Sequence, residues 1–175
     1  MLNYNEFGTG PTLLIAHGLY GSARNWGVIA KRLSDTRRVV VVDMRNHGDS
    51  PRFDTHSYPD MANDLAEVIE HIGAPVDVLG HSMGGKASMA LALTRPELVR
   101  SLISADIAPV SYTHSQIHFI EAMRAVDLNT VTRRAEASEQ LEAQGVSAEL
   151  QSFFTQSIDI SNKVWKLNFD ALAAD

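Results

Sequence analysis

The feature that most constrains the fold is an alternation of apolar runs and amphipathic stretches over the first 110 residues. The runs are short, rich in β-branched residues and bounded by turn residues, as is typical of strands buried in a parallel sheet. The stretches between them place apolar residues three or four apart, as on one helix face. This alternation predicts right-handed crossovers onto a doubly wound, mostly parallel α/β sheet. The expected strands are 12–16, 38–43, 75–80 and 99–107, with 2–7 as an antiparallel edge, and the expected helices are 22–33, 58–72 and 84–94.

From Tyr112 onward the pattern changes to amphipathic helix without strands. Apolar residues at helical spacing follow Ile117, an Ala/Glu/Gln-rich stretch ends at Gly145, and a further helix is expected over 153–165. We therefore expect an α/β core over 1–111 and an incomplete helical cap over 112–175, laid across the carboxyl edge of the sheet.

Composition excludes several classes of function. The net charge of -6 and the lack of a Lys/Arg-rich stripe argue against a nucleic-acid partner, and the absence of cysteine excludes disulfides and a thiolate nucleophile. No stretch approaches the roughly 18 apolar residues of a membrane span, and the start does not look like a secretion signal, so we expect a cytoplasmic protein without a membrane partner. Asp43 and Asp49 are expected to make structural hydrogen bonds. No spacing indicates a metal site, and no cofactor is expected.

The most specific motif is Gly80-His81-Ser82-Met83-Gly84, placed between an expected strand and an expected helix. Glycines on both sides of a serine allow a turn so tight that the hydroxyl is exposed above the sheet, and the following helix directs its positive end toward developing negative charge. A serine between two glycines can also arise by chance in a loop, but the strand-to-helix context favours a nucleophile elbow. Ser82 is the expected nucleophile.

A second motif, His17-Gly18-Leu19, follows the strand 12–16 directly. A tight turn there can aim the Leu19 N–H at the space in front of Ser82, where it would form a two-donor oxyanion hole with the N–H of Met83. His17 and His81 are expected beside this site. The alternative is an ordinary glycine turn capped by His17.

These motifs occur in an order that resembles the α/β-hydrolase superfamily, most closely its small carboxylesterase and thioesterase-like branch. The segments that carry the resemblance are H-G-L-Y-G-S (17–22), D-M-R-N-H-G-D-S (43–50), G-H-S-M-G-G-K (80–86), D-I-A-P-V (106–110) and W-K-L-N-F-D-A-L (165–172). The resemblance implies a Ser-His-acid triad that cleaves a small-molecule acyl ester or thioester through an acyl-enzyme on Ser82.

The resemblance also directs attention to Asp106, at the carboxyl end of the strand 99–107. Some members of the superfamily place the triad acid at this strand, and most place it after the next one. Asp106 is therefore the candidate acid, with a turn or cap aspartate ahead of Pro109 as the alternative.

In this superfamily the histidine follows the acid, beyond the last strand. None of the seven histidines fits that position: His17, His47 and His81 belong to loops of the site, His56 and His71 are expected in solvent, and only His114 and His118 follow Ser82. We expect the last strands and the catalytic histidine to be missing from 1–175. The uncovered strand 99–107 would then favour self-association or a second chain that supplies the strands. The alternatives are a truncated, non-catalytic homologue that acts in binding, and an enzyme that uses His114 or His118 as its base.

Overall fold

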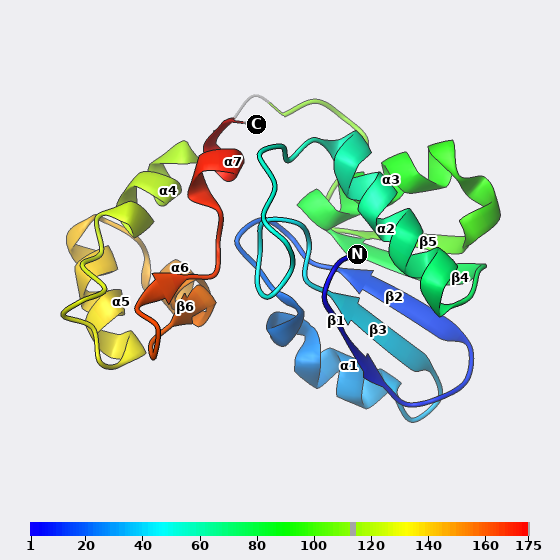
Figure 1. Cartoon of the computed structure of the whole chain (residues 1–175), viewed down its shortest axis with the longest axis horizontal. Coiled ribbons are helices and arrows are strands. Elements are labelled where there is room, and N and C mark those ends of the chain that lie inside the picture. The colour runs from blue at the N-terminus through cyan, green and yellow to red at the C-terminus, as the bar shows by residue number, and fades with distance from the viewer. Residues whose placement is uncertain (113–114, 175) are drawn as a thin grey trace.

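The computed structural model describes residues 1–112 and 115–174, and its central feature is a five-stranded sheet with helices on both faces (Figure 1). The strand order is β1-β3-β2-β4-β5, with β1 antiparallel to β3 and the other pairs parallel. The predicted doubly wound, mostly parallel α/β fold is therefore confirmed. The strands are β1 (Tyr4–Phe7), β2 (Thr12–Ala16), β3 (Arg38–Val42), β4 (Val76–His81) and β5 (Val99–Ala105).

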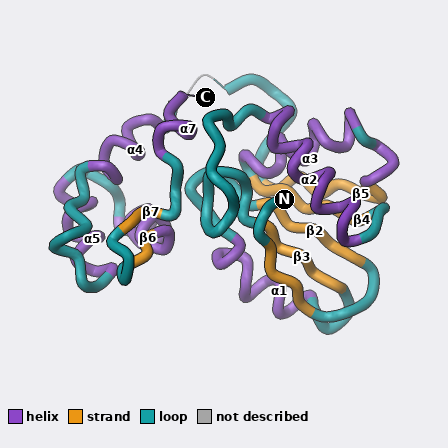
Figure 2. Tube along the Cα trace, in the orientation of Figure 1, coloured by secondary structure: helices purple, strands orange, loops and turns teal. Residues whose placement is uncertain are grey.

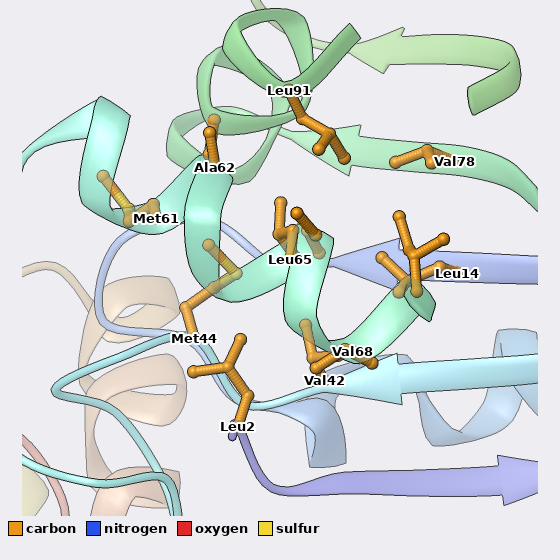
Figure 3. Packing of buried hydrophobic residues seen from close by; sticks show 14 of the residues in the cluster. Leu2, Leu14, Val42, Met44, Met61, Ala62, Leu65, Val68, Val78 and Leu91 are labelled. Carbon is orange, nitrogen blue, oxygen red and sulfur yellow. The ribbon is translucent and has the colours of Figure 1, made fainter. Parts of the chain in front are cut away.

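Alternate residues of each strand face the two helical layers. Leu14 and Val78 point to the face covered by α2 (Tyr58–Ile72) and α3 (Met83–Thr94), where they pack against residues such as Leu65 and Leu91 (Figure 3). Leu13 and its strand neighbours on the opposite face pack with the segment η1 (Ala23–Trp26) and α1 (Gly27–Leu33). Because helices cover both faces of the sheet, its strands consist of continuous apolar runs. Such runs are easy to recognise in the sequence.

The helices of the core begin and end close to the predicted residues. At the start of α2 the Ser57 hydroxyl accepts a hydrogen bond from the Asp60 N–H at 3.3 Å, and the helix ends at Gly73, which has φ 101°. The helix expected over 22–33 is instead a short 3₁₀ turn, η1, followed by α1. A second 3₁₀ turn, η2 (Pro96–Leu98), leads from α3 into β5.

The remaining described residues, 115–174, are called the cap segment here. Its helices are α4 (Ile117–Arg124), α5 (Arg134–Ala143), α6 (Ala148–Phe154), η3 (Thr155–Ser157) and α7 (Phe169–Ala174). The expectation of helices alone is wrong, because β6 (Ile158–Asp159) and β7 (Val164–Trp165) form an antiparallel pair among these helices (Figure 2).

The helix expected over 153–165 therefore does not form beyond Ser157. The Asp159 carboxylate accepts hydrogen bonds from both the backbone N–H and the side-chain amide of Asn162, and Lys163 follows with φ 56°. Asp and Asn side chains that bond to nearby backbone stabilise a turn at the expense of a helix. The side-chain hydrogen bonds of this turn thus compete with helix formation, and the segment forms a hairpin despite its helical spacing of apolar residues.

The cap segment has a hydrophobic cluster of its own, which includes Ile120, Met123, Leu141 and Phe154. Its last part is joined to the loop after β3 by backbone hydrogen bonds: the Gly48 N–H donates to Lys166 O, and the Asn168 N–H donates to Asn46 O, both at 2.9 Å. The cap segment is thus attached to the core at the carboxyl ends of the strands (Figure 1).

One edge of the sheet is formed by β5, which pairs with β4 on one side and with no other strand of the described residues. Ile103, in the middle of β5, is 51% exposed. Among the helices that the structure describes, none is both long and apolar enough to cross a bilayer.

Candidate active site

The candidate site lies where the carboxyl ends of β2 and β4 meet. These strands are parallel neighbours, with Ala16 paired to Gly80. After β2 the chain leaves to one side of the sheet to form β3, whereas after β3 it returns to the other side to form β4. Such a reversal opens a crevice at the carboxyl ends of the two strands, where ligands bind in open α/β sheets. The sheet order therefore brings the two predicted motifs together.

Ser82 occupies a sharp turn between β4 and α3. Its backbone has φ 51° and ψ -116°, a combination that non-glycine residues rarely adopt and that costs about 1–3 kcal/mol. The turn is crowded: a Cβ on Gly80 would lie 2.4 Å from Gly84 O, and a Cβ on Gly84 would lie 2.4 Å from Ala16 O. Neighbouring backbone atoms thus leave no room for a side chain at either glycine of the motif.

Two backbone hydrogen bonds hold this turn in place. The Ser82 N–H donates to Ala105 O, at the end of β5, at 3.0 Å, and the Ser82 carbonyl accepts from the Lys86 N–H in the first turn of α3 at 3.1 Å. Ser82 is thereby the residue that precedes a helix of 12 residues. The positive end of the helix dipole favours negative charge at this position.

The loop after β2 forms a tight turn directly against Ser82. The Gly21 N–H donates to Gly18 O at 3.0 Å, and Tyr20, the third residue of the turn, has φ 64°. Within the described part of the chain, neither the Leu19 N–H nor the Met83 N–H donates to a protein acceptor. The two amides proposed for an oxyanion hole are therefore available to a ligand.

His17 lies beneath this turn and not on its surface. Its side chain is 1% exposed; the Nδ1–H donates to Gly18 O at 2.8 Å, and Nε2 accepts from the Met44 N–H at 2.9 Å. Burial lowers the pKa of His17 to about 4. The ring is therefore neutral at ordinary pH and supports the turn from below.

Two further histidines lie near this turn, and of these only His47 was expected in a loop of the site. The His47 Nδ1–H donates to Arg45 O at 2.8 Å, while Nε2 accepts the Tyr20 N–H at 3.1 Å, and burial lowers the pKa of His47 to about 3. His56 was expected in solvent, but it is 6% exposed, and its Nε2 lies 3.2 Å from Met83 Sδ. The sequence carries no signal for the burial of His56, because its neighbours Asn46, His47 and Met83 are brought to it only by folding.

Asp106 follows β5 with φ 54°, and its side chain is 92% exposed. Its carboxylate lies 3.9 Å from Nε2 of His81, whose ring also contacts Trp26 edge-on at 6.1 Å between centroids. The structure thus places Asp106 beside His81, the residue that directly precedes Ser82. Its assignment as the triad acid remains a prediction.

The other histidines lie away from Ser82 or outside the description. His71 is exposed on α2, and His118 is exposed on α4, where its ring packs on Phe119 at 4.0 Å between centroids. His114 lies outside the described residues. No group of three His, Cys, Asp or Glu side chains suited to a metal ion occurs within 1–112 and 115–174.

A strained serine between a parallel strand and a helix, faced by a turn with free amides, defines the α/β-hydrolase class. The family model described as "alpha/beta hydrolase fold" matches residues 11–172, and the chain belongs to this family. It is 39% identical to the sn-1-specific diacylglycerol lipase ABHD11 of Mus musculus over 98% of this chain and 61% of that protein.

Two further relatives carry esterase names. The chain is 36% identical to Esterase YbfF of Escherichia coli K12, over 96% of this chain and 66% of that protein. Its fold superposes on a solved structure titled "Marine microorganism esterase" with a TM-score of 0.91 and 37% identity, over 99% of this chain and 70% of the other. The chain thus spans about three fifths of the length of the first curated relative.

Proposed function

We propose that the protein containing this chain is a serine hydrolase that cleaves a carboxylic ester or thioester through an acyl-enzyme on Ser82. The observation that supports this most directly is the strained backbone of Ser82, in a turn where close backbone contacts exclude a side chain at Gly80 and Gly84. Strain of this kind persists where the surroundings enforce it, and it is concentrated at functional sites. The esterase and lipase names of the relatives support an acyl ester as the substrate class.

In the proposed reaction, the Ser82 oxygen attacks the carbonyl carbon while a general base takes the hydroxyl proton. The carbonyl oxygen becomes an oxyanion that accepts hydrogen bonds from the Leu19 and Met83 N–H groups, each worth roughly 3 kcal/mol of transition-state stabilisation. The bond to the leaving alcohol or thiol then breaks, and the base returns its proton to that group. Water, activated in the same way, hydrolyses the acyl-enzyme and restores Ser82.

The general base is proposed to be a histidine outside residues 1–175. His17 and His47 are buried, and both ring nitrogens of each are engaged in hydrogen bonds. A ring held in this way cannot exchange a proton with the Ser82 hydroxyl. The relatives are longer than this chain, so their additional length offers a source for the base.

The test is a fluorophosphonate serine probe applied to the full-length protein, combined with hydrolysis of short-chain nitrophenyl esters. The wild type should be labelled at Ser82, and Ser82→Ala should lose both labelling and turnover. Ser88→Ala is the matched control, since Ser88 lies on the same helix with its hydroxyl bonded to Gly84 O at 2.7 Å. Undiminished hydrolysis by Ser82→Ala would contradict the proposal, and absence of labelling and hydrolysis in the wild type would favour a non-catalytic homologue.

A further inference from the structure

Tyr20 occupies a backbone position that its residue type disfavours. It is the third residue of the turn closed by the Gly21 N–H and Gly18 O, and its φ is 64°. A positive φ at this place in a turn is normally supplied by glycine or asparagine. A bulky aromatic residue remains there only where its surroundings hold it.

The backbone of Tyr20 is held from two sides by segments far away in the sequence. Its N–H donates to Nε2 of His47, in the loop after β3, at 3.1 Å. Its carbonyl accepts from the Ser157 hydroxyl, in the cap segment, also at 3.1 Å. Both peptide planes that flank Tyr20 are therefore fixed, one by the core and one by the cap segment.

The side chain of Tyr20 packs against the cap segment, although the residue itself lies in the loop after β2. It is 2% exposed and lies in the hydrophobic cluster of the cap segment, with its ring edge-on to Phe154 at 5.5 Å between centroids. Its hydroxyl donates to Gln116 O, just before α4, at 3.1 Å. Burial raises the pKa of Tyr20 to about 12, so the hydroxyl remains a donor at ordinary pH.

We propose that Tyr20 is a positioning residue through which the cap segment sets the geometry of the turn at residues 18–21, called the oxyanion turn here. The proposal rests on the proposed function, in which the Leu19 N–H stabilises the oxyanion. Leu19 directly precedes Tyr20, and the cap segment holds the carbonyl and the side chain of Tyr20. A displacement of Tyr20 would therefore also displace the backbone of Leu19 and redirect its N–H. The cap segment thereby acts on the chemistry, because hydrogen bonds to an oxyanion depend steeply on donor placement.

The experiment compares Tyr20→Ala, Tyr20→Phe and Phe119→Ala in the full-length protein. Phe119→Ala is the matched control, because Phe119 comes from α4 and packs on the same Phe154 ring at 5.2 Å between centroids. Tyr20→Phe keeps the ring and removes the bond to Gln116 O, so it tests the inference even where Tyr20→Ala folds poorly. For each variant we would measure kcat and KM on a short ester, affinity for a boronic acid that mimics the tetrahedral intermediate, and amide hydrogen exchange over residues 17–22.

If Tyr20 positions the turn, Tyr20→Ala should lower kcat and boronic acid affinity about a hundredfold, with KM within about threefold of the wild type. Exchange over 17–22 should rise in Tyr20→Ala but not in Phe119→Ala. Tyr20→Phe, which loses the bond to Gln116 O, should show the same changes in kcat and exchange at a smaller size, and wild-type values of both in Tyr20→Phe would count against the inference. Equal effects of Tyr20→Ala and Phe119→Ala on kcat and exchange would overturn the inference, since Tyr20 would then only pack the cap segment. Ser82→Ala, run alongside, separates the two failures: retained turnover there overturns the proposed function, while exchange still reports whether Tyr20 holds the turn.

Discussion

Gly18 and Ser82 lie in direct contact across the candidate site: a Cβ on Gly18 would stand 3.2 Å from the Ser82 Cβ and 2.9 Å from Nδ1 of His81. Residues 64 positions apart thus form one surface, because β2 and β4 are neighbours in the sheet. The turn that carries the Leu19 N–H approaches Ser82 this closely only because residue 18 has no side chain.

We therefore expect Gly18→Ala to displace the oxyanion turn from Ser82. Turnover should fall about tenfold or more, since small misplacements of catalytic groups are costly. Gly27→Ala is the control, because Gly27 lies in α1 with φ -56°, and a Cβ there would meet nothing within 4 Å. Ester hydrolysis and thermal unfolding of both variants provide the measurement. Equal turnover in the two variants would show that the turn does not serve catalysis.

Asp106 is predicted to be the triad acid. Substituting Asp106 distinguishes this catalytic role from a merely electrostatic contact with His81. Asp106→Asn in the full-length protein should lower turnover by orders of magnitude, because the acid orients the catalytic histidine and stabilises its charged form. His81→Asn removes the neighbour at 3.9 Å and should change turnover far less. A loss below about tenfold for Asp106→Asn corresponds to less than about 1.4 kcal/mol and would place the acid elsewhere.

The buried histidines predict a loss of stability in mild acid. Unfolded histidines have a pKa of about 6.5, whereas burial holds that of His17 at about 4 and that of His47 at about 3. Below pH 6.5 the unfolded chain therefore binds protons that the folded chain does not. Stability is fully present above pH 6.5 and declines toward pH 4, by up to roughly 1.4 kcal/mol per pH unit for each histidine.

Urea unfolding at pH 7, 6 and 5 measures this decline as the change in the free energy of unfolding. His47→Gln should flatten the pH dependence, whereas His71→Gln, which alters an exposed histidine, should leave it unchanged. Carboxylates contribute equally to all three proteins, so the comparison isolates His47. Parallel curves for the wild type and His47→Gln would rule out the buried ring as the cause.

The β5 edge predicts that residues 1–175, prepared alone, associate and do not hydrolyse esters. An uncovered strand presents unpaired N–H and C=O groups that can pair with another chain. Ile103→Lys should raise the monomer fraction seen by light scattering, since Ile103 is 51% exposed on β5. Leu93→Lys is the control on α3, where Leu93 is 84% exposed away from any strand edge. A monomeric wild-type chain with normal turnover would contradict both parts of this prediction.

The sheet and the turn that carries Ser82 could both be predicted from the sequence alone. The residues of β2 were predicted exactly, and those of β3, β4 and β5 to within two residues at each end, because strands buried on both faces need uninterrupted apolar runs. Ser82 could be proposed as the nucleophile because the signal is local: glycines stand on either side of the serine, and a strand and a helix flank them.

The groups that surround Ser82 could not be predicted in this way, because long-range contacts bring them together. The hydrogen bond from Tyr20 to His47 spans 27 residues, and that from Ser157 to Tyr20 spans 137. Likewise, the expected helix over 153–165 gave way to the turn at Asp159, and His56 became buried once the loops closed over it. The periodicity of apolar residues describes how each segment buries its own apolar face. Polar contacts between loops depend instead on the order of the strands and on the position of the cap segment. The packing of the whole chain fixes both.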